Sequence, residues 1–548
     1  MTKQLWASIV MISVICMFVT ACPGTDMYDV VVYGGTSAGI TAAIQAARLG
    51  KRVVLIDPSE HLGGLATNGL GFTDVGRPEV LGGMAREFYH RVWQAYQKPE
   101  AWKQDSREFF HTVPGQAVPS IDDVNQVQWS FEPHIAEQVY NEMIREADVL
   151  VVRGRLDLSN GVDKNGTHII GIRMEDGRTF HGRIYIDSSY EGDVMARAGV
   201  SYTVGREANS QYGETINGIE AAMARGNNLP LGIDPYATKG DPASGLLPSV
   251  NKNPGGIDGS ADKKIQAYCY RLCMTMDHDN RVIVDKPAGY DERDYELLIR
   301  ASEHGSTTPW KLSYIPNRKL DANNSSGASF DLIGLNYAYP DGDYATRAQI
   351  AAAQEAWQRG VIYTIQHNPR VPQSVREKYA QWGLAKDEFT DNHNWPRQLY
   401  IREARRMIGP FVETEVTLRN DATVNDSIGM GSYQIDSHNT QRYVDAAGEV
   451  RNEGDVQIGV NGPYRISYRS ITPRAGEAAN LLVPVCLSAS HVAYGSLRLE
   501  PVFMIVGQSA GTAASIAIDR GVAVQDVPYD VLRAQLLQEH QTLSMSGK

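Results

Sequence analysis

A cluster of small residues near the start of the chain has the spacing of a phosphate-binding turn. An apolar run at residues 30–33 leads into Gly34, Gly35, Thr36, Ser37, Ala38 and Gly39, and a segment of helical period follows to residue 49. A strand that turns this tightly into a helix needs small side chains, and the first N–H groups of the helix point at whatever lies above the strand. We therefore predict that a pyrophosphate binds at this turn, which opens a βαβ unit.

An acidic residue closes the second apolar run of this unit. Asp57 follows the run at residues 53–56 and lies about 20 residues beyond the glycines, where a carboxylate accepts hydrogen bonds from both ribose hydroxyls of a dinucleotide. Thr36 stands in place of the second glycine of the usual fingerprint. A glycine pattern alone is a weak signal, but strand, turn, helix, strand and acid in this order predict a dinucleotide site rather than an ordinary turn.

Further segments are predicted to reach the same ligand. A second glycine-rich loop follows Asp57 and contains Gly63, Gly64, Leu65, Ala66 and Thr67. Its backbone can pass close to a ligand because a side chain there would collide, although a flexible turn is the alternative. Apolar runs at residues 149–152 and 184–186 place Val152, Asp187 and Glu191 at or near strands, and open α/β sheets bind ligands at the carboxyl ends of their strands.

Proton transfer needs a different set of residue types, which lie toward the C-terminus. We predict that His491 is the proton acceptor, with His438 or Tyr464 assisting, and that Arg402 and Arg469 hold an oxygen or a carboxylate of the substrate. Two alternatives remain open. His491 can be a buried, hydrogen-bonded histidine, and the arginines at 402–406 can form ion pairs with nearby glutamates.

These residues must be positioned by a sheet, its covering helices and an insertion. Helical periodicity predicts helices near residues 81–96 and 131–144, and alternating runs at 149–152, 168–174 and 179–186 predict an antiparallel meander. Between residues 206 and 394 the dinucleotide pattern disappears, so we expect an inserted substrate domain with helices near 344–357 and 375–382. Its polar loop at 317–324 is either substrate-binding or a solvated surface loop.

Charge and the N-terminal segment bear on partners and location. The 548 residues include 52 basic and 64 acidic side chains, which gives no electrostatic footprint for nucleic acid. Residues 1–22 have a short basic start, an apolar run and a Val-Thr-Ala-Cys ending, so they read as a secretion signal with a lipid anchor on Cys22; an ordinary cleavage site is the alternative. We expect Cys269 and Cys273 to be buried as small apolar residues rather than joined in a disulfide, and we predict no metal site.

The segments together resemble the FAD-dependent oxidoreductases of exported bacterial proteins, which are related to the flavin fold of glutathione reductase and fumarate reductase. The motifs that carry the resemblance are GGTSAG with Asp57, LGGLATNGLGFTDVG, YIDSSYEGDV, QLYIREARRMIG and SASHVAYGSLRLEPVFMIVGQSAGTAA. The chain departs from the family at Pro484-Val485, where a glycine-arginine pair is usual.

The resemblance implies an FAD cofactor held by the glycine turns and Asp57. It also implicates a turn at the start of a small-residue helix, whose N–H groups would face the pyrimidine edge of the flavin. The residues predicted there are Gly507, Gln508, Gly511, Thr512 and Ala513.

The expected fold is α/β: a Rossmann-like FAD-binding domain of the glutathione reductase type with an inserted α+β substrate domain. We place the FAD-binding domain at residues 28–205 and 395–535, the insertion at 206–394 and a tail at 536–548. The expected function is dehydrogenation of a CH–OH group of a sugar or sugar acid, on a small-molecule or oligosaccharide substrate and with an unidentified electron acceptor. The alternatives are a flavin-dependent lyase, a C=C reductase and a surface glycan-binding lipoprotein without catalysis.

Overall fold

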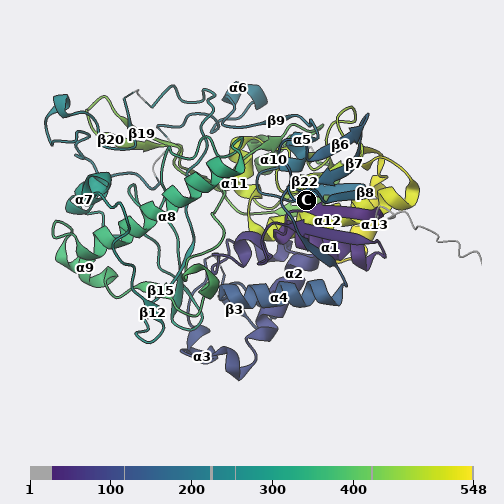
Figure 1. Ribbon diagram of the computed structural model, residues 1–548, viewed down its shortest axis with the longest axis horizontal. Helices are drawn as coiled ribbons and strands as arrows, with labels where there is room; N and C mark the ends of the chain where they lie inside the picture. Colours follow the sequence, from purple (N-terminus) through teal and green to yellow (C-terminus); the bar gives the residue numbers. More distant parts are fainter. Residues whose placement is uncertain (1–26, 117, 223–225, 253–254, 421–423, 546–548) are drawn as a thin grey trace, which may run out of the picture.

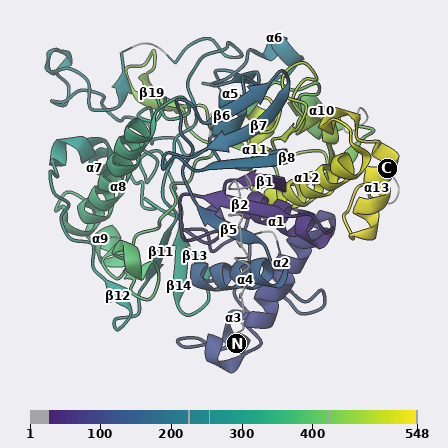
Figure 2. The ribbon, with the colours of Figure 1, turned by 45° about the vertical axis from the view of Figure 1, so that its right-hand side comes forward.

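A parallel sheet carries the first strand, turn and helix. The computed structural model describes residues 27–545 except 117, 223–225, 253–254 and 421–423, so the signal and lipid-anchor prediction for residues 1–22 lies outside the described residues. In the sheet, β1 (Met27–Tyr33) lies between β2 (Val53–Asp57) and β8 (Thr179–Asp187). The short edge strands β5 (Leu150–Arg153) and β23 (Leu481–Leu482) are also parallel to their neighbours. The α/β fold class is confirmed (Figure 2).

The predicted meander differs from the observed one in its first strand. The run at residues 149–152 belongs to β5, which pairs in parallel with β2 because α4 (Pro133–Glu146) provides the crossover between them. The antiparallel strands are instead β6 (Val162–Asn165), β7 (His168–Arg173) and β8. The same apolar run therefore extends the parallel sheet at its edge.

Two long helices pack together against the sheet. α1 (Ser37–Arg48) and α12 (Glu500–Arg520) approach so closely that a Cβ on Gly507 would lie 2.4 Å from the Ala38 carbonyl oxygen. A Cβ on Gly511 would lie 2.5 Å from the Ala42 carbonyl oxygen. Among the described residues, α12 is long and apolar enough to cross a membrane, but 94% of its apolar window is buried inside the protein. It is therefore a core helix.

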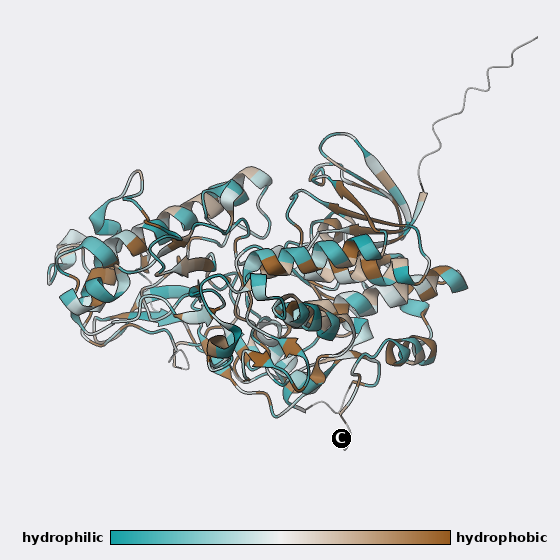
Figure 3. Ribbon diagram, turned by 90° about the horizontal axis from the view of Figure 1, so that it is seen from below, coloured by the Kyte–Doolittle hydropathy of each residue, from teal (hydrophilic) through white to brown (hydrophobic). Residues whose placement is uncertain are grey.

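A second body of structure lies beside the first (Figure 1). Its antiparallel sheet has the order β12 (Arg281–Val282), β15 (Gly383–Ala385), β11 (Leu272–Thr275), β14 (Lys319–Ala322) and β13 (Ser313–Ile315). The helices of this body are α7 (Glu296–Glu303), α8 (Tyr344–His367) and α9 (Gln373–Tyr379). Both predicted helices are present, and α8 runs ten residues further than the prediction, from 357 to 367. Brown and teal residues alternate along the helices in Figure 3, as expected of amphipathic helices.

The remaining elements connect the two bodies and cover the sheets. The short strands are β3 (Ile121–Asp122), β4 (Val127–Gln128), β9 (Tyr202–Thr203), β10 (Val250–Asn251), β16 (Arg406–Met407), β17 (Ser427–Gly431), β18 (Ile435–Ser437), β19 (Gln441–Val444), β20 (Val450–Glu453), β21 (Val456–Ile458) and β22 (Tyr464–Ser467). The helices are α2 (Gly83–Ala95), α3 (Arg107–Phe110), α5 (Asp193–Arg197), α6 (Asn209–Tyr212), α10 (Glu415–Asn420), α11 (His491–Leu497) and α13 (Tyr529–Gln538). Strand β10 pairs with β19, so chain from beyond residue 394 joins the inserted region; the predicted domain boundaries stay a prediction.

Two further segments matter for the site. The arginine-rich segment at residues 397–407 contains no helix and ends in β16, which pairs with β9. Cys273 lies in β11. Cys269 and Cys273 are buried free thiols, as predicted, and Cys486 is also a buried free thiol.

Candidate cofactor and active site

A cavity opens at the carboxyl edge of the parallel sheet. It has a volume of about 300 Å³, and its lining includes Gly34, Gly35, Thr36, Asp57 and Gly64. Glu191 and Tyr190 line it from the segment that follows β8. The structure thus brings the two predicted glycine loops, the predicted acid and Glu191 to one site at the edge where α/β sheets bind ligands.

The first glycine turn is built for close backbone approach. Gly34 has φ +101°, and a Cβ there would lie 2.5 Å from the Ser189 nitrogen. The Thr36 hydroxyl accepts a hydrogen bond from the Gly39 N–H at 3.2 Å and donates one to the Ser188 carbonyl at 2.8 Å. Thr36, which stands in place of the second glycine of the fingerprint, is therefore the N-cap of α1. The first-turn N–H groups of Ser37 and Ala38 stay outside the helix hydrogen bonds and are available to an anion.

Asp57 is held in place by backbone donors. Its two carboxylate oxygens accept from the Gly35 N–H at 2.5 Å and the Ser59 N–H at 2.7 Å. Burial raises the pKa of Asp57 to about 6, although these two hydrogen bonds oppose the rise. The carboxylate is thus preoriented on the cavity wall, where the fingerprint places the ribose-binding acid.

The second loop is tied to the start of α12. Gly64 has φ +56°, and a Cβ there would lie 2.3 Å from the Tyr190 hydroxyl. That hydroxyl accepts from the Leu65 N–H at 2.9 Å and donates to Glu500 at 2.8 Å. Glu500 also accepts from the Ser37 hydroxyl, so the first residues of α1 and α12 share one carboxylate. Burial raises the pKa of Glu500 to about 7, although the hydrogen bonds from Ser37 and Tyr190 oppose the rise.

The predicted turn at Gly507–Ala513 is wrong. Helix α12 begins at Glu500, so these residues lie in its interior, where the helix uses their N–H groups. Gly507 and Gly511 allow the contact with α1, and Gln508 accepts from the Met84 N–H at 2.7 Å. The Thr512 hydroxyl donates to Gln508 and Glu539, and Ala513 is fully buried. Pro501 in the first turn is the sequence signal for the true start, since proline favours the first helical position.

Other predicted cofactor residues have mixed positions. The Asp187 carboxylate accepts from the Ser189 N–H, the Ser189 hydroxyl and the Met195 N–H, so it stabilises the turn after β8 and points into the protein. The Thr67 hydroxyl donates to the Leu62 carbonyl within the second loop, beside buried Ala66. Val152 pairs with Ile56 across the sheet edge. Their contacts to a cofactor stay a prediction.

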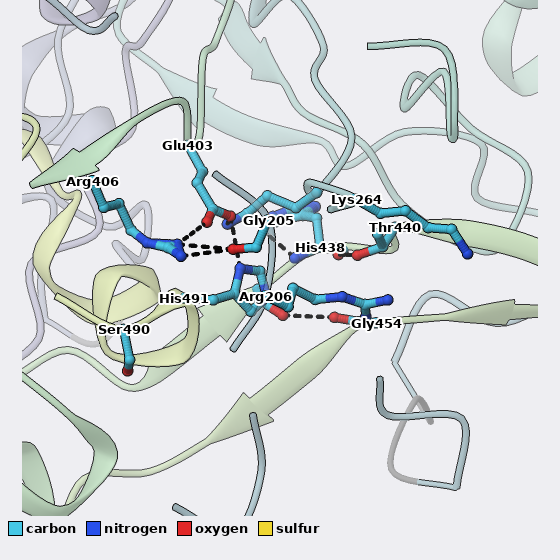
Figure 4. Close-up of polar contacts among 12 residues, drawn as sticks. Gly205, Arg206, Lys264, Glu403, Arg406, His438, Thr440, Gly454, Ser490 and His491 are labelled. Carbon is cyan, nitrogen blue, oxygen red and sulfur yellow. Dashed lines mark hydrogen bonds and ion pairs between the residues drawn. The ribbon is translucent and has the colours of Figure 1, made fainter. Parts of the chain in front are cut away.

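His491 is paired with a buried glutamate. It begins α11, where Ser490 is the N-cap, and its Nδ1 lies 2.7 Å from Glu403 Oε2. Glu403 lies between His491 and Arg406, whose Nη1 is 2.5 Å away (Figure 4). Burial favours protonation of Glu403, but His491 and Arg406 outweigh it and lower the pKa of Glu403 to about 2. An ionised Glu403 accepts a hydrogen bond from the Nδ1–H of His491, so Nε2 is the ring nitrogen that this carboxylate does not engage.

A chain of buried hydrogen bonds joins His491 to two other predicted residues. Gln266 donates to Glu403 at 3.1 Å and accepts from the His438 N–H at 3.2 Å. His438 Nδ1 lies 3.0 Å from one oxygen of Asp331, and Arg402 donates to the other oxygen at 3.0 Å. The structure therefore brings His491, His438 and Arg402 together. Sequence reasoning missed the linking residues Gln266 and Asp331.

All three arginines form ion pairs, but of the nearby glutamates expected as partners, Glu403, Glu413 and Glu415, only Glu403 pairs with one of them in the described chain. Arg402 pairs with Asp331, Arg405 with Asp193 and Asp341, and Arg406 with Glu207 and Glu403. Burial, then the nearby Arg402, lowers the pKa of His438 to about 4, although Asp331 opposes this. His438 is therefore neutral at neutral pH.

Two predicted catalytic residues do not join the cluster. The Tyr464 hydroxyl bonds to the Ser496 hydroxyl at 2.6 Å inside the core, and Tyr464 is fully buried. The Arg469 side chain is 43% exposed; it pairs with Asp426 at 2.9 Å and lies over the Phe411 ring. Tyr464 and Arg469 share no described contact with His491, His438 or Arg402. The prediction of a catalytic role is therefore wrong for both, and they are structural residues whose polar groups bind Ser496 and Asp426.

The polar loop at 317–324 faces inward. Lys319 Nζ lies 2.7 Å from Glu132 and 2.8 Å from Glu388, and all three side chains are almost completely buried. His134 lies beside the same carboxylates, so Glu132, His134 and Glu388 have metal-like spacing. The Lys319 ammonium already supplies the cation between these carboxylates. The loop is thus a hairpin that carries buried ion pairs, so its interpretation as a solvated surface loop is wrong, and its substrate-binding interpretation stays a prediction.

Comparison with known proteins identifies the chain. The family model described as FAD dependent oxidoreductase matches residues 29–536. The chain belongs to the FAD dependent oxidoreductase family. Its cofactor is therefore FAD and it is an oxidoreductase enzyme, in agreement with the glycine turn and the Asp57 wall of the cavity.

Solved flavoproteins resemble parts of the chain. A flavin monooxygenase from Stenotrophomonas maltophilia is 18% identical and covers 33% of this chain, with a TM-score of 0.19. The anhydrotetracycline hydroxylase OxyS from Streptomyces rimosus is 14% identical over 34% of this chain, with a TM-score of 0.23. A thioredoxin reductase from Streptococcus pyogenes is 17% identical over 30%, with a TM-score of 0.17. The chain spans 42%, 36% and 35% of these proteins respectively.

Proposed function

We propose that this FAD-dependent oxidoreductase dehydrogenates a CH–OH group of a sugar or sugar acid. The observation that carries the proposal is the buried His491–Glu403 pair, to which Gln266 of the inserted region also donates a hydrogen bond. Dehydrogenation of an alcohol needs a base for the hydroxyl proton, and a neutral imidazole oriented by a carboxylate is well suited to that role.

The residues have separate roles in this reaction. Bound FAD supplies the acceptor for the hydride that leaves the carbon. The Nε2 of His491 takes the hydroxyl proton, and Glu403 stabilises the positive charge that then develops on the imidazole. In the part of the chain that the structure describes, the Nε–H of buried Arg402 has no partner, so it can donate to a substrate oxygen.

The cofactor is held by groups that do not take part in proton transfer. The N–H groups of Ser37 and Ala38 would bind the pyrophosphate, Asp57 would accept hydrogen bonds from the ribose, and Gly34 and Gly64 would leave room for the cofactor. Mutations can therefore separate cofactor binding from catalysis. A substitution at one of these cofactor-binding residues should reduce the FAD content, whereas a substitution at His491 should keep FAD and lose turnover.

The test is anaerobic bleaching of the bound flavin by a panel of sugars and sugar acids. We expect at least one compound to bleach the wild-type holoprotein and to yield a carbonyl product. His491→Gln should keep its FAD and bleach about 100-fold more slowly or less. His278→Gln is the matched control, because that side chain is 90% exposed. Unchanged bleaching in His491→Gln would remove the proposed base, and an unsaturated product without net electron transfer would indicate a lyase.

We further propose that the protein is exported and tethered to a bacterial membrane through a lipid on Cys22. The support is the apolar run and the Val-Thr-Ala-Cys sequence at residues 19–22. Expressed in a bacterium with labelled palmitate, the wild type should carry the label and Cys22→Ala should not. A labelled Cys22→Ala protein would contradict the anchor.

A further inference from the structure

Three arginines surround one tyrosine next to the proposed base. The guanidinium carbons of Arg402, Arg498 and Arg271 lie 4.7, 5.4 and 5.9 Å from the centre of the Tyr400 ring. Arg498 also donates to the Tyr400 hydroxyl. Only two residues separate Tyr400 from Glu403 in the chain, so this cluster adjoins the His491–Glu403 pair.

The cluster also adjoins the loop that lines the cofactor cavity. Asn68 follows the second glycine loop, lines the cavity and accepts from Arg397 at 3.2 Å. A few residues further on, the N–H groups of Gly71 and Phe72 donate to Asp321, the carboxylate that holds Arg271. The segments 64–74 and 397–403 therefore lead from the FAD cavity to the Tyr400 cluster.

Several donors in this cluster lack protein acceptors. Arg402 and Arg498 are 0% and 3% exposed, and in the described chain the Nε atom of each has no hydrogen-bond partner. Tyr400 is 8% exposed; its oxygen accepts from Arg498, and no described residue accepts its hydroxyl proton. Three buried N–H and O–H donors without acceptors around one ring indicate a ligand that supplies oxygen atoms.

The charge balance decides what kind of oxygen ligand fits. Each arginine already has its own carboxylate: Arg271 with Asp321, Arg402 with Asp331, and Arg498 with Asp436. This leaves the carboxylate of Asp74. It accepts from the Tyr433 hydroxyl at 3.3 Å and has no cation within ion-pair distance among the described residues. Burial raises the pKa of Asp74, and the nearby Arg271, Lys311 and Arg498 oppose the rise. A ligand carboxylate would bring a further negative charge next to this buried group, whereas a hydroxyl group can donate to Asp74 and accept from Arg498 or Arg402.

We infer that the Tyr400 cluster, with Asp74, is the substrate-binding wall and selects neutral, hydroxylated sugars over sugar acids. The inference rests on the proposed function and narrows its substrate class. Arg402, Arg498 and Tyr400 donate to hydroxyl oxygens of the sugar, and Asp74 accepts a hydroxyl proton in a hydrogen bond. The same wall repels a sugar carboxylate through Asp74.

The test measures binding rather than turnover. Purified holoprotein is titrated with the pairs glucose and glucuronate, galactose and galacturonate, and mannose and mannuronate, and the unfolding temperature is recorded. We expect a neutral sugar to raise the unfolding temperature more than its acid partner. Asp74→Asn should lower the affinity for the neutral sugar and raise that for the acid, since the carboxylate that accepts from one and repels the other is gone. Tyr400→Phe should lower the affinity for the neutral sugar about tenfold, because it removes one hydrogen-bond donor.

The outcomes separate this inference from the proposed function. A stronger response to the acids in the wild type, no response to any pair, or an unchanged preference in Asp74→Asn would overturn the inference. Asp279→Asn is the matched control, because that side chain is 94% exposed. Neutral sugars that bind with the expected preference but never bleach the flavin would leave the inference standing and refute the proposed dehydrogenation.

Discussion

Replacing Glu403 with glutamine tests the role of the buried carboxylate behind His491. Glu403→Gln keeps the size of the side chain but removes the charge that orients the Nδ1–H and stabilises the developing imidazolium. A hydrogen bond to a charged group contributes about 1.5–3 kcal/mol, and each 1.36 kcal/mol is tenfold in rate. The limiting rate of flavin bleaching should therefore fall by roughly 10- to 150-fold, with little change in FAD content.

The variant should still fold, because its other partners remain. Arg406 keeps Glu207 and the Gly205 carbonyl as acceptors, and Gln266 stays in place. The assay is anaerobic stopped-flow bleaching at saturating substrate, with circular dichroism and the flavin-to-protein ratio measured on the same sample. Glu355→Gln is the control, because Glu355 makes a partly exposed ion pair with Arg359 on α8. A Glu403→Gln protein that is folded, loaded with FAD and bleached within about twofold of the wild-type rate would refute the proposed role.

Three further predictions concern the cofactor site and its supporting helices. Gly34→Ala should lose most of its bound FAD, because φ +101° is strained for alanine and its Cβ would lie 2.5 Å from the Ser189 nitrogen. The flavin-to-protein ratio after reconstitution measures this loss, and a normal ratio would contradict the prediction. Gly507→Ala should destabilise the protein by about 1–3 kcal/mol, because its Cβ would lie 2.4 Å from the Ala38 carbonyl oxygen. Denaturant unfolding measures the loss of stability, and a drop in FAD affinity without such a loss would contradict the role of Gly507 in the helix contact. Ribose binding needs an ionised Asp57, and burial raises the pKa of Asp57 to about 6, so the affinity for FAD should fall as the pH drops below about 6. Fluorescence titration of the apoprotein with FAD from about pH 5 to pH 8 measures this affinity. An affinity that does not change with pH would contradict the prediction.

The cofactor-binding residues could be predicted from the sequence because they lie close together in the chain. Gly34, Gly39 and Asp57 lie within one βαβ unit, where the order of the elements is set by short connections. The small residues at 507–513 gave the wrong element boundary for a related reason. A glycine and alanine pattern suits both a phosphate-binding turn and the contact between two helices, and only Pro501 marked the start of α12.

The catalytic end depends on contacts between distant parts of the chain. Glu403 and His491 are 88 residues apart, and Gln266 lies 137 residues before Glu403. Hydrophobic periodicity carries no information on such pairs, so His491 could be proposed by residue type but its partner could not be derived. Tyr464 and Arg469 were proposed on the same grounds, and packing placed their polar groups against Ser496 and Asp426 instead.

The most direct test of the account is anaerobic bleaching of the holoprotein by neutral sugars, with the product identified in the same reaction. The account predicts that at least one neutral sugar reduces the bound FAD, that one carbonyl product forms for each flavin reduced, and that His491→Gln loses this reaction while it retains FAD. Bound FAD that dithionite reduces but that no sugar bleaches would contradict the account.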